Sequence, residues 1–83
     1  MRIDKFLKVS RIIKRRTVAS EMAQAGRVSV NGNKAKPATV VKPGDIVEIG
    51  FGQGKTRIRV KELRPTVRKE EAVELYELLE DDA

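Results

Sequence analysis

The sequence has no cysteine and no histidine, and its only aromatic residues are one tyrosine and two phenylalanines. Without cysteine the chain forms no disulfide and has no thiolate nucleophile, which fits a reducing cytosol. Without histidine an enzyme would lack the commonest general base and the commonest metal ligand. No nucleophile stands near a base, and the acids outside the C-terminal end are scattered. The sequence therefore favours a binding protein over an enzyme, and we expect no metal and no cofactor.

Long apolar segments are also missing. The longest runs without a charge are six residues, for example residues 49–54. A transmembrane helix needs about 20 apolar residues, and these runs leave no room for the core of a secretory signal. We therefore expect a cytoplasmic protein that has no membrane partner.

Basic residues are abundant and unevenly distributed. Eighteen Lys and Arg against twelve Asp and Glu give a net charge of +6. Residues 1–36 carry ten basic and two acidic side chains, whereas residues 70–83 carry seven acids and no base. Such a basic body indicates a polyanionic partner, either nucleic acid or an anionic membrane surface. Short helices barely supply the broad apolar face of a membrane-surface binder, so nucleic acid is favoured.

Apolar residues three and four positions apart predict two short helices within residues 3–25. The positions that carry this pattern are Ile3, Phe6, Leu7, Val18, Met22 and Ala25. Asp4 places a carboxylate in the first turn of the first helix, where it favours the helix dipole. Thr17 is predicted as the N-cap of the second helix and Gly26 as its left-handed C-cap. Residues 10–16 break the period and are predicted as a connector.

After Gly26 the hydrophobic pattern changes to alternation, which is typical of strands. Val28 and Val30 precede Asn31-Gly32, a strong hairpin signal, and Pro43-Gly44 predicts a type II turn. Residues 46–49 and 56–63 are predicted as further strands, joined by a loose glycine-containing loop. Because this loop lacks the spacing of a P-loop, we interpret it as a hairpin connection rather than a phosphate site.

The acidic C-terminal end again has a helical pattern. Ala72, Leu75, Tyr76 and Leu79 are spaced to form one apolar face, which predicts a helix over residues 68–82 with an acidic outer face. We expect this helix to dock on the sheet or on a partner protein. The predicted organisation is a domain of residues 1–65 followed by an acidic helix within residues 66–83, in an α+β fold.

Several motifs occur in an order that resembles a known family. They are residues 1–7 (MRIDKFL), 11–16 (RIIKRR), 26–32 (GRVSVNG), Lys36-Pro37, Val41 and residues 43–45 (PGD). Over about residues 1–50 the chain resembles the S-four-type RNA-binding domain, also called the alpha-L motif. This resemblance implies two short helices packed on a small bent antiparallel sheet, with a basic groove that faces structured RNA.

The candidate RNA-binding residues follow from charge clustering and from this resemblance. They are Arg2, Asp4, Lys5, Lys8, Arg11, Lys14, Arg15, Arg16, Arg27, Lys34 and Lys36. The resemblance implies that Arg2 and Arg16 contact RNA phosphates or bases. Asp4 is either a helix-start carboxylate or a brace that orients a nearby arginine, because a carboxylate can fix the guanidinium plane. Lys14 and Arg15 are expected to contribute long-range attraction.

Stand-alone members of this family of similar length form two groups. The chain is more similar to the ribosome-associated quality control P family than to the small heat-shock group, which usually has an aromatic residue where Lys8 stands and a long basic tail. The resemblance implies a monomeric adaptor that binds large-subunit ribosomal RNA and peptidyl-tRNA on obstructed large ribosomal subunits. There it would support alanine tailing directed by the partner factor RqcH. A heat-shock-type recycling factor and a general structured-RNA binder remain the alternatives.

Overall fold

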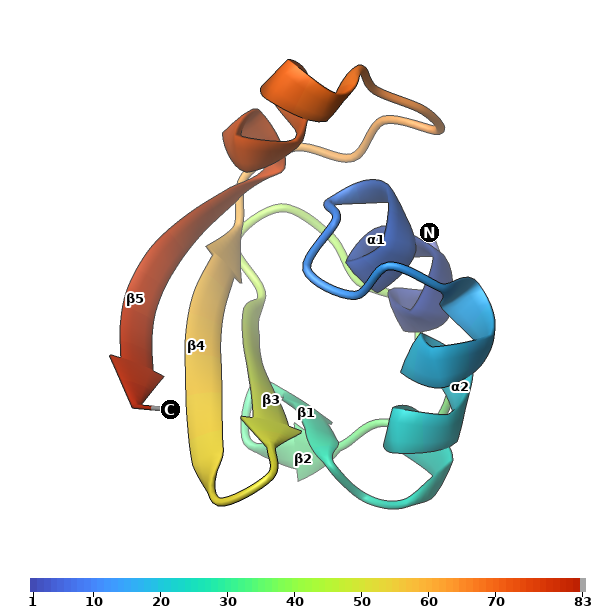
Figure 1. Cartoon of the computed structure of the whole chain (residues 1–83), viewed down its shortest axis with the longest axis vertical. Coiled ribbons are helices and arrows are strands. Elements are labelled where there is room, and N and C mark those ends of the chain that lie inside the picture. Colours follow the sequence, from blue (N-terminus) through green and yellow to red (C-terminus); the bar gives the residue numbers. More distant parts are fainter. Residues whose placement is uncertain (83) are drawn as a thin grey trace.

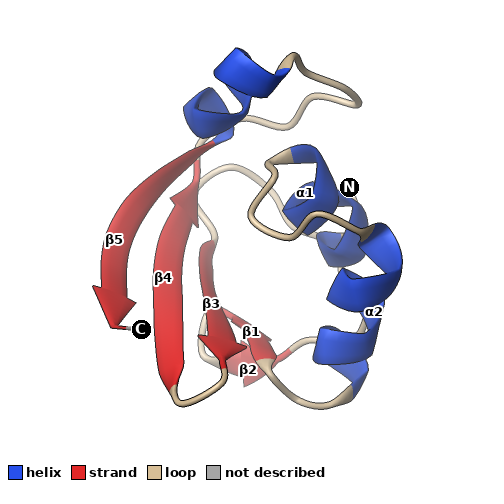
Figure 2. Cartoon of the chain, in the orientation of Figure 1, coloured by secondary structure: helices blue, strands red, loops and turns tan. Residues whose placement is uncertain are grey.

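The computed structural model of the chain describes residues 1–82, folded as two layers (Figure 1). The helices α1 (Ile3–Val9) and α2 (Arg16–Gln24) cover one face of a curved antiparallel sheet with strand order β2-β1-β3-β4-β5 (Figure 2). The strands are β1 (Val28–Val30), β2 (Asn33–Lys34), β3 (Ile46–Phe51), β4 (Gly54–Val60) and β5 (Tyr76–Asp82). The predicted α+β class, with two short helices on a bent antiparallel sheet, is confirmed. Ala83, the last residue of the segment expected to be helical, lies outside the described residues.

The hydrophobic core lies between the helices and the sheet. From α1, Ile3, Phe6 and Leu7 are fully buried, as their spacing predicts. The sheet contributes the inward-facing residues of its alternating strands, which are Val28, Val30, Val47, Ile49, Ile58 and Val60. Burial of this face fixes the register of the strands, because a slip of one residue would turn every core side chain outward.

The buried face of α2 differs from the predicted one. Ala19 and Ala23 face the core, whereas Val18 is exposed and Met22 is only partly buried. The helix also begins at Arg16, so Thr17 lies inside it, and the N-cap Arg15 makes no side-chain cap bond. A tertiary contact accounts for this earlier start, since the side chain of Arg16 is held by α1, as described below.

The predicted turns are confirmed by their backbone angles. Asn31 and Gly32 both have positive φ, 51° and 85°, as the two-residue turn between Val30 and Asn33 requires. Gly44 has φ 95°, and its turn is closed by the backbone N–H of Asp45 donating to the Lys42 carbonyl at 3.1 Å. These local signals therefore place the hairpins correctly.

The loop predicted between the third and fourth strands is tighter than expected. Phe51 pairs with Gly54, which leaves Gly52 and Gln53 as a two-residue turn. Gly50 belongs to β3, and its N–H donates to the Arg27 carbonyl at 2.8 Å. Pairing with β4 on one side and contact with Arg27 on the other extend the strand through a glycine that, in sequence, indicates a loop.

The predicted C-terminal helix over residues 68–82 is wrong. Lys69–Leu75 forms a short 3-10 helix, and the chain then becomes β5, which pairs antiparallel with β4 (Figure 1). A strand satisfies the backbone groups along the edge of β4, which a helix would leave unpaired. The side chains also match, because Glu77 binds Arg59 at 2.7 Å across the pair of strands. The helical spacing of apolar residues is thus overridden by edge pairing and charge.

The C-terminal segment shares the core of the preceding residues. Leu75 is fully buried in the main cluster, and the sheet continues across the boundary expected at residues 65 and 66. A bulge at Leu79 shifts the register between the pairs Arg57–Glu80 and Ile58–Leu78. The acidic end is therefore an edge strand of the same sheet.

Candidate nucleic-acid interface

A buried carboxylate joins the start of α1 to the start of α2. Asp4 is 3% exposed, and its two oxygens accept hydrogen bonds from Arg2 Nη2 at 3.0 Å and Arg16 Nη2 at 3.3 Å. The arginine side chains are themselves 49% and 46% exposed. Each guanidinium has further N–H donors, so one contact with Asp4 does not exhaust it. The result is two half-exposed cations held in fixed positions by one anion; we call these three residues the arginine brace.

Backbone contacts fix the position of Asp4. The N–H of Ile3 donates to the Thr39 carbonyl at 2.7 Å, and the N–H of Asp4 donates to the Pro37 carbonyl at 3.4 Å. Arg2 forms an isolated β-bridge with Val40. The first turn of α1 is thereby tied to the loop after β2, and the carboxylate sits where the helix dipole favours it.

The two buried carboxylates of the described residues have different surroundings. Asp45 accepts from the side-chain amide of Asn31 at 3.1 Å and from the backbone N–H of Lys42 at 3.0 Å, so its partners are turn groups. The side chain of Asp4 instead binds two surface arginines from separate parts of the chain. Its environment matches the brace interpretation, in which a carboxylate orients guanidinium groups toward a ligand.

The connector between the helices is anchored at its middle and basic at its surface. Ile13 is buried, and its N–H donates to the Leu7 carbonyl at 3.1 Å. On either side of it, Arg11, Lys14 and Arg15 are exposed. Burial of one isoleucine therefore holds three cations outside the core.

The structure does not bring all predicted site residues into one cluster. Lys5 and Lys8 lie on α1, half-buried and exposed, and Lys36 begins the turn whose Thr39 contacts the start of that helix. Arg27 and Lys34 lie near the C-terminal end of α2, whereas Arg16 is at its N-terminal end. The helix rise separates these two ends by roughly 13 Å. A Cβ on Gly26 would be 3.5 Å from Lys34 Nζ, so this ammonium sits near the C-terminal end of α2, where the helix dipole favours a cation.

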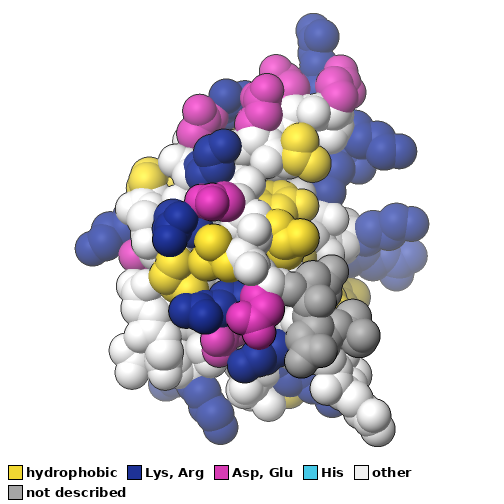
Figure 3. All heavy atoms as spheres, turned by 90° about the vertical axis from the view of Figure 1, so that its left-hand side faces the viewer, with side chains coloured by type: hydrophobic (Ala, Val, Ile, Leu, Met, Phe, Trp, Pro, Cys, Tyr) yellow, Lys and Arg dark blue, Asp and Glu magenta, His cyan; other side chains and the backbone are white. Residues whose placement is uncertain are grey.

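The basic residues of β4 lie against carboxylates of the neighbouring strands. On β4, Lys55 and Arg57 approach Glu48 at 4.0 and 3.8 Å, and Arg59 binds Glu77. Figure 3 shows this face, where Lys or Arg and Asp or Glu side chains lie side by side around a band of hydrophobic ones. By contrast, none of the ion pairs among the described residues involves Lys8, Arg11, Lys14 or Arg15. The end of α1 and the connector therefore carry four basic side chains without an ion pair among the described residues, whereas those of β4 lie against carboxylates.

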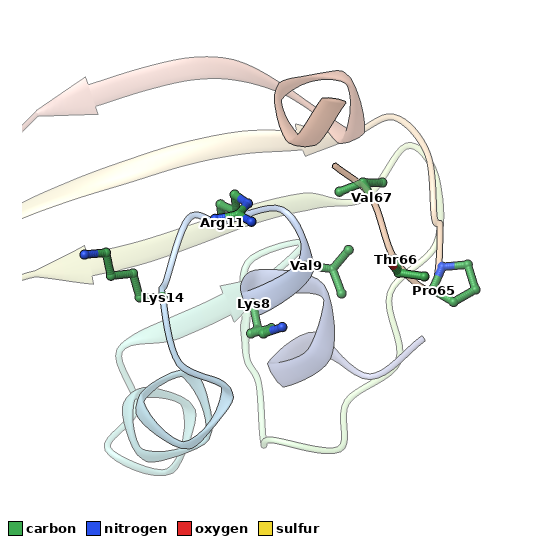
Figure 4. A pocket seen from close by; sticks show the side chains of 7 residues that line it. All are labelled: Lys8, Val9, Arg11, Lys14, Pro65, Thr66 and Val67. Atoms are coloured by element: carbon green, nitrogen blue, oxygen red, sulfur yellow. The ribbon is translucent and has the colours of Figure 1, made fainter. Parts of the chain in front are cut away.

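The structure adds a segment that sequence reasoning missed. Pro65, Thr66 and Val67 cross the C-terminal end of α1 and line a pocket together with Lys8 and Arg11 (Figure 4). These residues follow the last motif of the resemblance by about 20 positions, and no local signal in the sequence links them to α1. Only the path of the chain after β4 brings them there.

The described part of the chain offers little for other classes of site. Among the acidic side chains that the structure describes, no group of three or more is placed to hold a metal ion. No helix in the same range is long and apolar enough to cross a membrane.

Comparison with known proteins shows which families this chain resembles. The S4 domain family matches residues 1–47, which contain the arginine brace and the connector. The chain is 54% identical over 82 residues to the RQC P-site tRNA stabilizing factor of Bacillus subtilis, covering 99% of this chain and 95% of that protein. It is 55% identical to the protein of the same name from Halalkalibacterium halodurans, with coverages of 99% and 93%.

A solved structure also shares the fold. The trimeric structure of Vibrio cholerae Heat Shock Protein 15 superposes with a TM-score of 0.88 at 31% sequence identity, covering 95% of this chain and 81% of that one. The likeness extends through the C-terminal part, well beyond the 47 residues that the family matches.

Proposed function

Because the chain belongs to the S4 domain family and to the group of RQC P-site tRNA stabilizing factors, we propose that it is a non-catalytic RNA-binding adaptor of ribosome-associated quality control. The observation that carries this proposal is the arginine brace. A buried carboxylate that holds two half-exposed guanidinium groups pre-sets their geometry, and planar guanidinium groups suit phosphate oxygens and base edges.

The surrounding charge supports a nucleic-acid partner. The cations of α1 and the connector that have no ion pair among the described residues lie, in sequence, between the two arginines of the brace, whereas those of β4 are paired with carboxylates. Phosphate contacts position a protein on RNA, and oriented side chains add selectivity. We assign the brace to positioned contacts and the exposed Lys14 and Arg15 to electrostatic attraction.

The names of the relatives indicate where such an adaptor acts. The relatives from Bacillus subtilis and Halalkalibacterium halodurans are both called RQC P-site tRNA stabilizing factor. We propose that this chain, in the cytoplasm, binds large-subunit ribosomal RNA and peptidyl-tRNA on obstructed large subunits and supports alanine tailing directed by RqcH. We propose a monomer, although the heat shock neighbour is described as trimeric; the mass of the free protein by light scattering distinguishes the two.

Co-sedimentation with ribosomal fractions tests this function. We expect enrichment on free large subunits that carry peptidyl-tRNA over empty large subunits and over 70S particles. A matched sample treated to release the tRNA serves as the control. Equal recovery on every fraction, or on duplex DNA at the same salt, would instead support a general nucleic-acid binder.

Replacing both Lys14 and Arg15 by alanine should reduce the salt dependence of RNA binding. If both contact phosphates, the slope of log K against log salt should become shallower by about 1.4–1.8. Because both residues are exposed, the thermal melt should be nearly unchanged. The measurement is a salt titration of RNA affinity by fluorescence anisotropy.

A double variant of the sheet provides the matched control. Lys55→Ala with Arg59→Ala removes the same charge, but from residues that lie against Glu48 and Glu77. Its slope should remain close to that of the parent. Equal slopes for the two double variants would show that the connector is not at the RNA.

A further inference from the structure

A small basic pocket lies where the end of α1, the connector and the segment after β4 meet (Figure 4). Its volume is about 240 Å³. Lys8 and Arg11 approach it from α1 and the connector, and Pro65 and Val67 form the wall contributed by the later segment. Pockets that enclose drug-sized ligands measure about 300–1,000 Å³, so this smaller pocket would cover part of one such ligand and leave the rest in solvent.

The positive charge of the pocket favours an anionic ligand. Its lining includes three cationic side chains and no carboxylate. In the part of the chain that the structure describes, none of these cations has an ion-pair partner, whereas the nearby Arg64 is bound by Glu62 and Glu74. Unpaired like charges gathered in a concave site raise the local concentration of anions.

Backbone geometry singles out Arg11 within the pocket. Its backbone has φ 62°, in the left-handed region that residues other than glycine and asparagine seldom adopt. Its N–H donates to the Lys8 carbonyl at 3.0 Å, which ends α1 in this conformation. Glycine would fit this position without strain, so an arginine here carries a local conformational cost, as residues at functional sites often do.

The wall opposite the cations is apolar. Val9 and Val67 are partly buried against the core, and Figure 4 shows Val9 directed toward Val67, with Pro65 farther out beyond Thr66. A ligand that suits this pocket is anionic at one end and has a compact, weakly polar body at the other. An unpaired RNA nucleotide has this chemistry, because its phosphate is charged and its base has two apolar faces.

We propose that the pocket binds one unpaired nucleotide extruded from structured RNA. Lys8 and Arg11 hold its phosphate, and the base lies against Val9, Pro65 and Val67. This proposal rests on the RNA-binding function proposed above and deepens it, because it assigns a bulged or looped-out nucleotide to a site that includes residues beyond the matched 1–47.

Two RNA hairpins of equal nucleotide count test the proposal, one with a single-nucleotide bulge in its stem and one fully paired. The full-length protein should bind the bulged hairpin about fivefold or more tightly, because the extruded nucleotide adds hydrogen bonds from cations to its phosphate and buries apolar surface of its base. Thr66→Glu, which places a carboxylate at the exposed rim of the pocket, should reduce this preference to less than about twofold. Gln53→Glu adds the same charge at the β3–β4 turn and should leave the preference unchanged.

Two further measurements examine the base and the arginine. A hairpin with an abasic bulge should lose most of the preference, since it keeps the phosphate but lacks the base. Arg11→Gly should melt at or near the temperature of the parent, because glycine adopts φ 62° without strain, and yet lose the preference. Retention of the preference in either measurement overturns the proposed occupant.

The failures of the two proposals are distinguishable. Equal affinity for the bulged and paired hairpins, or equal behaviour of Thr66→Glu and Gln53→Glu, overturns the nucleotide pocket while RNA binding stands. Absence of binding to either hairpin and to large subunits overturns the RNA-binding function itself.

Discussion

Replacing Arg16 by alanine is expected to weaken binding to large ribosomal subunits by about 5- to 150-fold, equivalent to about 1–3 kcal/mol. Arg16 is the first residue of α2, where the first backbone N–H groups have no partner within the helix and favour a phosphate. Asp4 fixes that guanidinium at 3.3 Å. The alanine variant therefore loses a positioned donor, not only a charge. The measurement is a binding titration of each variant against purified large subunits.

Folding should change little in this variant. The side chain of Arg16 is 46% exposed, and the buried Asp4 carboxylate keeps its hydrogen bond from Arg2 at 3.0 Å, so the loss of stability should be about 1 kcal/mol. Arg16→Lys keeps the charge but lacks the planar donor group, so it should recover only part of the binding. If Arg16→Ala binds like the parent, or loses binding only in proportion to a lower melting temperature, Arg16 is a structural residue.

Asp4→Asn gives the sharpest control for the arginine brace. This change raises the net charge from +6 to +7 (one carboxylate fewer), so long-range electrostatics alone would strengthen RNA binding. An amide, however, presents an NH₂ group where one of the two arginines needs an acceptor. We expect binding to weaken by about 1 kcal/mol or more despite the added charge. Tighter binding would show that Asp4 is only a helix-start carboxylate.

Replacing Leu75 by alanine is expected to cost about 2–5 kcal/mol of the free energy of unfolding. Leu75 ends the 3-10 helix and is fully buried in the main core. Its backbone carbonyl also accepts the N–H groups of Lys61 and Glu62 at 2.8 and 3.2 Å, which holds the side chain in place. A domain of this length has a total stability on the order of 4–12 kcal/mol, so the loss is a large fraction of it.

Leu78→Ala is the matched control, because it removes the same atoms from a side chain that is 55% exposed. Its cost should stay below about 1 kcal/mol. Urea denaturation measures both, with a lower midpoint and an unchanged slope expected for Leu75→Ala. Similar midpoints for the two variants would mean that the acidic C-terminal segment is not part of the core.

Much of the matched N-terminal half could be predicted because its signals are local. The apolar spacing of Ile3, Phe6 and Leu7 predicts α1, and positive φ at Asn31 and Gly32 is a property of those two residues in a two-residue turn. Such preferences act within a few residues, so they can be inferred without knowing where the rest of the chain lies.

The arginine brace could be predicted only in part. The sequence indicates that Asp4 begins a helix or orients an arginine, but it does not show which arginine. The structure supplies Arg2 and Arg16 together, the second from twelve positions away. The structure also places the N-cap of α2 at Arg15 rather than at the predicted Thr17. The distance between Asp4 and Arg16 depends on how the two helices pack, which no local pattern encodes.

The sequence by itself determined the basic character of the helical side, the α+β class and the hairpin turns, because charge, period and turn chemistry are read residue by residue. Only the tertiary structure decided that the acidic C-terminal segment forms a strand and not a helix. The spacing of Ala72, Leu75 and Leu79 fits a helix, yet residues 76–82 pair with β4, where Glu77 meets Arg59 across 18 positions of sequence. The open edge of β4 and its arginines exist only after the sheet has formed, and their hydrogen bonds and ion pairs outweigh a local helical preference.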